Sequence, residues 1–343
     1  MEAVKVPVPR VVVRYTGKDI TADITPTLIE LTYTDVVEGE SDTLELMLED
    51  SAGRWQDAWY PQQGDTLSAQ IGYEGTPLLP CGDFEIDEIT LDGATGQGDT
   101  VRIRALAAGV KRSVRTHKGR AYENVTLADI AATVARRNKL KLKGTIERIQ
   151  IARVTQAYEA DLPFLKRVAA EYGYAFSVRG ADLTFFKRSA LKDAKPVLVI
   201  GRADVLGHYS FRDKVHGVVE AATVSYHDPR AKVTRRRTVK DKRGGTNRAS
   251  ADELKLNIRA EDDTQARVKA EAALDRANED QTGATLEGIP GNTRLVSGVN
   301  VQLAGYGKFS GKYNINQARH SFSRSGGYTT AVELKRVRAR EKA

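Results

Sequence analysis

One pattern of β-strand residues occurs twice in this chain of 343 residues, once near each end. Gly82-Asp83-Phe84-Glu85-Ile86 returns as Gly311-Lys312-Tyr313-Asn314-Ile315, at an offset of 229 positions. The offset is again 229 where Gly98-Asp99-Thr100 is followed later by Gly327-Tyr328-Thr329. Any two alternating strands look alike, but chance does not also preserve their order and spacing. The sequence therefore predicts two similar β-domains that arose by duplication.

The composition predicts a protein with real hydrophobic cores. Hydrophobic residues make up 41% of the chain and charged residues 29%. No run approaches the roughly 18 apolar residues of a membrane span, and the first residues lack the apolar stretch of a secretory signal. The single cysteine, Cys81, excludes an intrachain disulfide and a thiolate metal cluster. We expect synthesis in a reducing cytoplasm.

The periodicity of apolar residues divides the chain into three segments. Residues 1–109 alternate as β-strands do and fit a small barrel or sandwich. Residues 110–197 combine helical spacing with a hairpin and predict a small α/β domain. Strands return in residues 198–343, with a helix at about 264–278. The expected fold class is mainly β (α+β): two similar β-domains with a small α/β insertion domain.

Local signals place two helices in the middle segment. Thr126 is expected to cap a helix that buries Ile130 and Val134. Asp161 is expected to cap a second helix, and Gly173 is expected to end it, because glycine readily adopts the left-handed conformation at a helix C-terminus.

The sequence contains no arrangement typical of catalysis. There is no Gly-x-Ser-x-Gly elbow and no phosphate-binding loop. The five histidines include no pair at helical spacing, and the adjacent acids Asp87 and Glu88 point to opposite faces of a strand. We therefore predict no enzymatic activity, no cofactor and no metal site.

One segment carries the excess positive charge. The predicted loop 230–248 contains nine Lys or Arg residues and one acid, Asp241, so its net charge is +8. This equals the net charge of the whole chain, +8. Such a segment attracts phosphates, but no aromatic residue is present there to stack on bases. Contact with an acidic protein surface is favoured over weak DNA contact. Trp55 and Trp59 could bind a sugar or a base. The favoured interpretation is that the two side chains close the end of the first β-domain. The candidate partner-interface residues are Arg235, Arg236, Arg237, Lys240, Lys242, Arg243, Trp55 and Trp59.

Several motifs together resemble the phage late control protein D family of baseplate hub proteins. The resemblance covers nearly the whole chain in the same order, and its C-terminal cluster is the most specific part. The motifs are Trp55 to Trp59-Tyr60-Pro61 with Gly64-Asp65, the helix Phe164 to Gly173, Gly305 to Tyr313, His320-Ser321-Phe322-Ser323, and Gly326 to Thr330.

The resemblance implies a structural part of a contractile injection particle, such as a myophage tail, an R-type pyocin or the N-terminal hub region of a VgrG spike. It implies two tube-like β-barrel domains per subunit and a homotrimeric ring with sixfold pseudo-symmetry. One face of the ring would seat the hexameric tail tube, the other a trimeric spike protein, and the lumen would hold the end of the tape-measure protein. Other baseplate proteins are further expected partners. Because the chain stops at Ala343, the spike is expected to be a separate protein.

Two rival functions come from other classes. A basic, DNA-binding regulatory protein would bind duplex DNA tightly and lose that binding as salt rises. A cell-wall hydrolase would need paired acids in a suitable setting, and we find none. We expect a protein made in the bacterial cytoplasm that becomes part of a phage tail or tailocin baseplate, with at most weak DNA contact.

Overall fold

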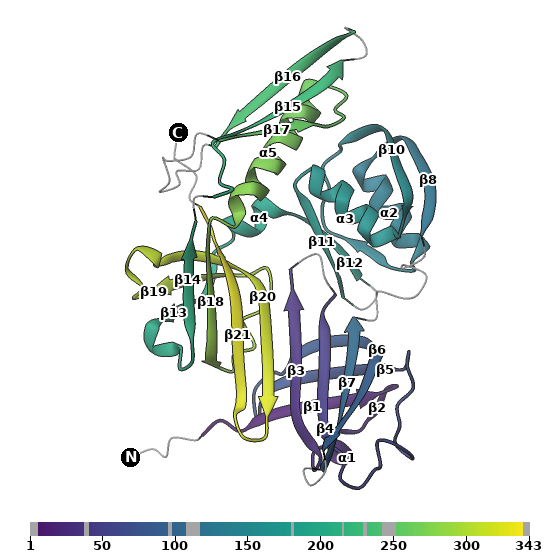
Figure 1. Cartoon of the computed structure of the whole chain (residues 1–343), viewed down its shortest axis with the longest axis vertical. Coiled ribbons are helices and arrows are strands. Elements are labelled where there is room, and N and C mark those ends of the chain that lie inside the picture. The colour runs from purple at the N-terminus through teal and green to yellow at the C-terminus, as the bar shows by residue number, and fades with distance from the viewer. Residues whose placement is uncertain are drawn as a thin grey trace.

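The computed structural model describes residues 6–37, 41–94, 98–107, 117–179, 182–214, 216–228, 232–241 and 252–338. The fold is mainly β, which confirms this part of the expected fold class. The molecule is elongated, with the N-terminal strands at one end of its long axis and the hairpin of β15 and β16 at the other (Figure 1).

The N-terminal strands, here called the first half, enclose one hydrophobic core. The predicted alternation is confirmed, because Leu44, Leu46 and Leu48 are all buried while their neighbours are not. A short helix, α1 (Thr21–Ile24), closes one end of this core through Ile24. The strands are β1 (Pro9–Tyr15), β2 (Lys18–Asp19), β3 (Leu28–Val36), β4 (Thr43–Glu49), β5 (Thr66–Tyr73), β6 (Leu79–Ala94) and β7 (Gly98–Ala107).

The middle of the chain forms a compact α/β unit with its own core. Thr126 caps α2 as predicted, and its hydroxyl and the carboxylate of Asp129 form a reciprocal capping box. Gly173 follows α3 with a φ of +76°, as predicted for the end of that helix. The elements are β8 (Lys118–Thr126), α2 (Leu127–Arg137), β9 (Lys141–Lys143), β10 (Gln150–Glu159), α3 (Asp161–Glu171), β11 (Tyr174–Arg179), β12 (Asp182–Lys187) and α4 (Arg188–Asp193).

The predicted capping role of Asp161 is wrong. Ala160 occupies the N-cap position of α3 without any side-chain cap. The Asp161 carboxylate is instead fully buried beneath the helix, where it accepts hydrogen bonds from the side-chain amides of Asn138 and Gln156, both at 2.9 Å. It also pairs with the Arg137 guanidinium at 3.0 Å. Buried charge must be paired, and these partners come from α2 and β10, so the carboxylate joins three elements of the unit.

The C-terminal strands, here called the second half, enclose a third core. Strand β13 crosses the predicted boundary at residue 198 and pairs with β19, so the second half begins slightly earlier than expected. The elements are β13 (Pro196–Gly201), the 3₁₀ helix η2 (Arg202–Asp204), β14 (Tyr209–Asp213), β18 (Thr282–Pro290), β19 (Asn300–Ala304), the 3₁₀ helix η3 (Gly307–Phe309), β20 (Gly311–Ser323) and β21 (Gly327–Arg336).

A three-stranded sheet and one helix interrupt the second half. The predicted helix is α5 (Asp263–Glu279), whose buried Ala266, Ala270 and Leu274 pack against this sheet rather than against the larger one. The strands are β15 (Ala221–Asp228), β16 (Val233–Lys240) and β17 (Glu253–Asn257). The sheet and α5 share a separate hydrophobic core, which the sequence did not predict.

The two halves have the same strand order. Pairing runs β3-β4-β7-β6-β5-β1 in the first half and β14-β18-β21-β20-β19-β13 in the second. The hairpins β6–β7 and β20–β21 also share their register and carry a β-bulge at the same place. The last strands differ, since β1 is antiparallel to β5 whereas β13 is parallel to β19. Residues in equivalent positions, each 229 apart, are Ile86 and Ile315, Glu88 and Gln317, Ala94 and Ser323, and Gly98 and Gly327.

The two halves join where β3 pairs antiparallel with β20, so that within the described residues one sheet of 13 strands runs through both. At this junction His320 is fully buried and its ring stacks on Tyr33, with 6.1 Å between ring centroids. Its Nε2 lies 3.0 Å from the carbonyl oxygen of Leu295, so Nε2 carries the proton and Nδ1 accepts from the Tyr328 hydroxyl at 2.8 Å. His320 therefore packs and forms hydrogen bonds inside this junction.

Replacing Asp161 with alanine should destabilise the chain by about 3–5 kcal/mol, because the Arg137 guanidinium would stay buried without its partner. Denaturant unfolding measures this loss. Asp182→Ala is the matched control: it removes a more exposed ion pair with Lys143 and should cost less than about 1 kcal/mol. Equal losses in the two variants would contradict the assigned role of Asp161.

Burial lowers the pKa of His320 from 6.5 to about 4. As the pH falls from 6.5 towards 4, the unfolded chain takes up the proton before the folded chain does. The free energy of unfolding should therefore decrease across this window, by on the order of 3 kcal/mol for this group. In His320→Gln this part of the acid dependence should disappear, whereas His227→Gln, at an exposed position on β15, should retain it. Unfolding curves between pH 7 and pH 4 test both variants, and unchanged acid dependence in His320→Gln would contradict the assignment.

Candidate interaction surfaces

The basic segment is not a loop in the part that the structure describes. Val233–Lys240 forms β16, an edge strand paired antiparallel with β15. The prediction of a loop over 230–248 is therefore wrong for these residues, because charge density alone does not exclude an exposed edge strand. Long basic side chains are indeed common on such edges, where they discourage further strand pairing. Lys242 and Arg243 lie outside the described residues.

The described basic residues divide between the two faces of β16. Arg235 and Arg237 lie opposite Tyr226 and Val224, which are buried against α5, so these two arginines share the α5 side. The Arg237 guanidinium lies 3.4 Å from the Asp263 carboxylate at the first residue of α5. On the other face, Arg236 and Lys240 are both exposed. This face therefore presents two cations from a rigid strand in the hairpin that forms one end of the molecule (Figure 1).

The tryptophan pair lies far from the basic strand. Trp55 is buried in the core of the first half, and Trp59 is 37% exposed and meets it edge to face, with 5.5 Å between ring centroids. Both line a depression of about 530 Å³ together with Ile24 of α1. Figure 1 places α1 and β16 at opposite ends of the long axis. The tryptophan pair therefore packs beside α1, and the structure does not bring the six described candidate residues together.

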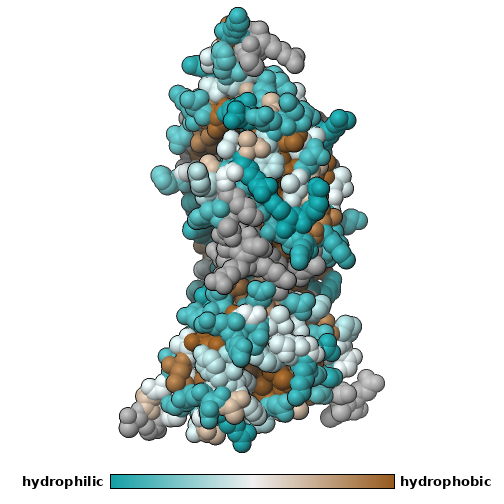
Figure 2. Space-filling view, turned by 90° about the vertical axis from the view of Figure 1, so that its right-hand side faces the viewer, coloured by the Kyte–Doolittle hydropathy of each residue, from teal (hydrophilic) through white to brown (hydrophobic). Residues whose placement is uncertain are grey.

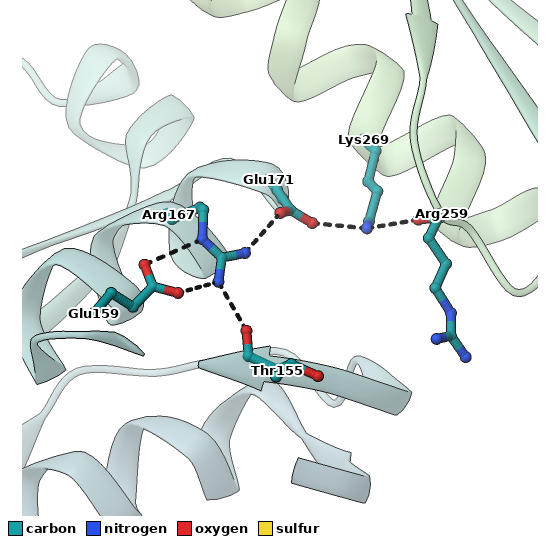
Figure 3. Close-up of polar contacts among 6 residues, drawn as sticks. All are labelled: Thr155, Glu159, Arg167, Glu171, Arg259 and Lys269. Atoms are coloured by element: carbon teal, nitrogen blue, oxygen red, sulfur yellow. Dashed lines mark hydrogen bonds and ion pairs between the residues drawn. The ribbon is translucent and has the colours of Figure 1, made fainter. Parts of the chain in front are cut away.

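Polar contacts hold α5 and its sheet against the α/β unit (Figure 3). Lys269 of α5 is nearly buried, and its ammonium group lies 2.8 Å from the Glu171 carboxylate of α3. It also donates to the carbonyl oxygen of Arg259 at 2.8 Å and lies 4.9 Å from the ring centroid of Tyr172. Glu171 in turn lies 3.7 Å from Arg167.

On the far side of Arg167, the guanidinium pairs with Glu159 and donates to the carbonyl oxygen of Thr155 at 3.1 Å (Figure 3). The chain of contacts therefore runs from β10 through α3 to α5. It fixes the direction in which the basic hairpin points relative to the rest of the molecule. Sequence reasoning missed these residues, and the only local signal for them was the four-residue spacing of Arg167 and Glu171.

Two observations on the described residues bear on metal binding and thiol chemistry. No three His, Cys, Asp or Glu side chains are grouped closely enough there to hold a metal ion. Burial raises the pKa of the Cys81 thiol, which opposes formation of a nucleophilic thiolate. None of the described helices has the length and apolar character needed to cross a bilayer.

Comparison with known proteins assigns the family. A family model described as the phage tail baseplate hub (GPD) matches residues 85–326. A probable baseplate hub protein of Escherichia phage 186 is 31% identical over 245 residues, which cover 68% of this chain. The match spans 61% of that relative's length.

Solved structures share the fold. A tail protein from Neisseria meningitidis MC58 superimposes with a TM-score of 0.71 over 96% of each chain, at 13% identity. The c3393 protein of E. coli, described as a component of the type VI secretion system, superimposes with a TM-score of 0.58 over 92% of this chain and 74% of its own, at 12% identity. At such low identity these likenesses show the fold alone.

The matches to the family model and to the phage 186 protein cover most of this chain. The chain belongs to the phage tail baseplate hub family. The family agrees with the resemblance seen in the sequence motifs. Neither the comparisons nor the geometry of β16 supports the alternative of a DNA-binding regulator.

Proposed function

We propose that this protein is the structural hub of a contractile injection particle, in which three copies form a ring between the tail tube and the spike. The observation that carries the proposal is the shared strand order of the two halves. If each chain has two similar β units, a trimer contains six such units. Such a trimer can meet a hexameric tube on one face and a trimeric spike on the other.

In this proposal each half acts as a tube-like β-barrel domain, and the α/β unit is an insertion between them. The separate cores of the two halves support this division. The halves are not identical, and their differences supply the threefold character that a trimeric spike requires. The first half carries the tryptophan pair, while the second carries the basic strand and α5.

The remaining parts of the proposal follow from the same ring. Its lumen holds the end of the tape-measure protein before firing, and its outer surface meets other baseplate proteins. The function is mechanical, without catalysis or cofactors, and DNA makes at most weak or transient contact in passing through the lumen. The protein is made in the bacterial cytoplasm and ends in the baseplate of a phage tail or tailocin.

The mass of the assembled hub tests the ring. Analytical ultracentrifugation of the purified protein, and mass measurement of hubs released from particles, should give three times the mass of one chain. Three copies follow from the need to match two β units per chain to a sixfold tube. A hub containing two, four or six copies in the particle would refute the proposal.

The basic strand is proposed to contact an acidic surface of a neighbouring baseplate protein. Replacing Arg235, Arg236, Arg237, Lys240, Lys242 and Arg243 with glutamine should lower the yield of complete particles several-fold, because exposed charges steer and orient association. Counting particles by electron microscopy measures this yield. The control replaces exposed Lys139, Lys141 and Lys166 of the α/β unit with glutamine, and unchanged yield in the basic-strand variant would refute the interface.

A further inference from the structure

An exposed strand edge in the first half corresponds to a covered edge in the second. The offset of 229 relates the β6 segment Glu88–Ala94 to the β20 segment Gln317–Ser323. In the second half that segment pairs with β3 along its whole length. In the first half β5 pairs with β6 only from Leu79 to Glu85, and the segment beyond the bulge has no partner strand on that side within the described residues. Leu91, the equivalent of buried His320, is 51% exposed.

Strand β3, which covers the Gln317–Ser323 edge of β20, also has an equivalent strand in the second half. β3 pairs with β4, which pairs with β7, while β14 pairs with β18, which pairs with β21. Following these registers makes Tyr33 equivalent to Phe211 and Leu31 equivalent to Tyr209, so apolar core-facing residues match in both cases. β14 lies at the end of the large sheet, and β18 is its partner on one side.

The strand equivalence has independent support in an aspartate that occurs at both positions. Continued along both strands from Tyr33 and Phe211, the same registers make Asp35, near the end of β3, equivalent to Asp213, at the end of β14. Each carboxylate accepts a hydrogen bond from a hydroxyl: Ser297 bonds Asp35 at 2.7 Å, and Thr282 bonds Asp213 at 2.8 Å. β14 is therefore the second-half counterpart of β3.

We propose that β14 of one subunit pairs antiparallel with the Glu88–Ala94 edge of β6 in the next subunit. This inference rests on the proposed ring and names the strands that close it. This contact would repeat, between two subunits, the antiparallel strand pairing that β3 and β20 form within one chain. The internal register, transferred to the new pair, places Phe211 opposite Leu91, Arg212 opposite Thr90 and Lys214 opposite Glu88.

The side chains on these two edges complement one another. On the outward face Glu88 and Asp92 of β6 would meet Arg212 and Lys214, and opposite charges across a strand pair are favourable. On the core face the exposed Leu91 would be covered by Phe211, just as Tyr33 covers His320 within the chain. Figure 2 views the molecule from the side on which β5 and β6 lie in Figure 1, and apolar side chains reach the surface in its lower part.

The geometry of this contact makes a closed ring possible. Each chain has one β14 edge to offer and one β6 edge to fill, so the interface is heterologous and links subunits head to tail. If the within-chain and between-chain contacts are alike, three chains give six similar junctions around the axis. Closure then covers strand edges that would otherwise invite uncontrolled pairing.

A cysteine pair tests the register directly. Thr90→Cys combined with Arg212→Cys should give disulfide-linked trimers on non-reducing gels after mild oxidation of the hub and of intact particles. The matched control, Leu91→Cys with Arg212→Cys, places the two thiols on opposite faces of the strand pair and should give no cross-link. Cys81 is buried and should contribute no background, which the two single variants check.

A charge-reversal series provides a second readout that needs no cross-link. Glu88→Lys with Asp92→Lys should convert trimers to single chains in ultracentrifugation, as should Arg212→Glu with Lys214→Glu. The four changes together should restore the trimer.

The outcomes separate the two levels of the proposal. A trimer that forms no specific cross-link and survives the charge reversals would overturn this strand pairing while leaving the hub ring intact. Particles whose hub is not trimeric would overturn the ring and this inference together.

Discussion

The backbone pairing of β3 with β20 is the interaction on which the rest of the structure depends. It brings together strands nearly 290 positions apart, as the contact between the hydroxyls of Thr32 and Ser321 illustrates. Without it the two halves would be separate sheets, held together by fewer contacts such as those of Tyr73 with Tyr328 and of Asp35 with Ser297. With it they share one sheet, and the α/β unit and the α5 sheet lie beside that common sheet. Buried His320 can serve there because both of its ring nitrogens have partners.

Local features of this fold were readable from the sequence. The alternation around Leu46, the capping of α2 by Thr126 and the end of α3 at Gly173 depend on neighbours a few residues away. The paired hairpins were also visible, because turn glycines and inward apolar residues recur at one spacing. The family was readable for the same reason, since its motifs lie in these turns and strands.

Features that depend on distant partners were not readable. Asp161 resembles a capping residue in the sequence, but its role follows from Asn138 and Gln156, which only the folded chain brings near. The strand at β16 was mistaken for a loop because its cations outnumber its apolar residues. Its alternation becomes meaningful only beside β15, where Val224 and Tyr226 face α5. The contacts from Lys269 to Glu171 likewise join residues 98 positions apart.

The distance in sequence between β3 and β20 also orders events during synthesis. At about 5–20 residues per second, a ribosome needs on the order of 15–60 s to translate from one strand to the other. Throughout that time the edge of β3 that β20 later covers has no partner strand, because β20 has not yet been synthesised. Contacts of such long range also slow folding itself. The sheet is thus completed only when the C-terminal hairpin is complete. A truncated translation product would keep an open β3 edge and lack the sheet that runs through both halves.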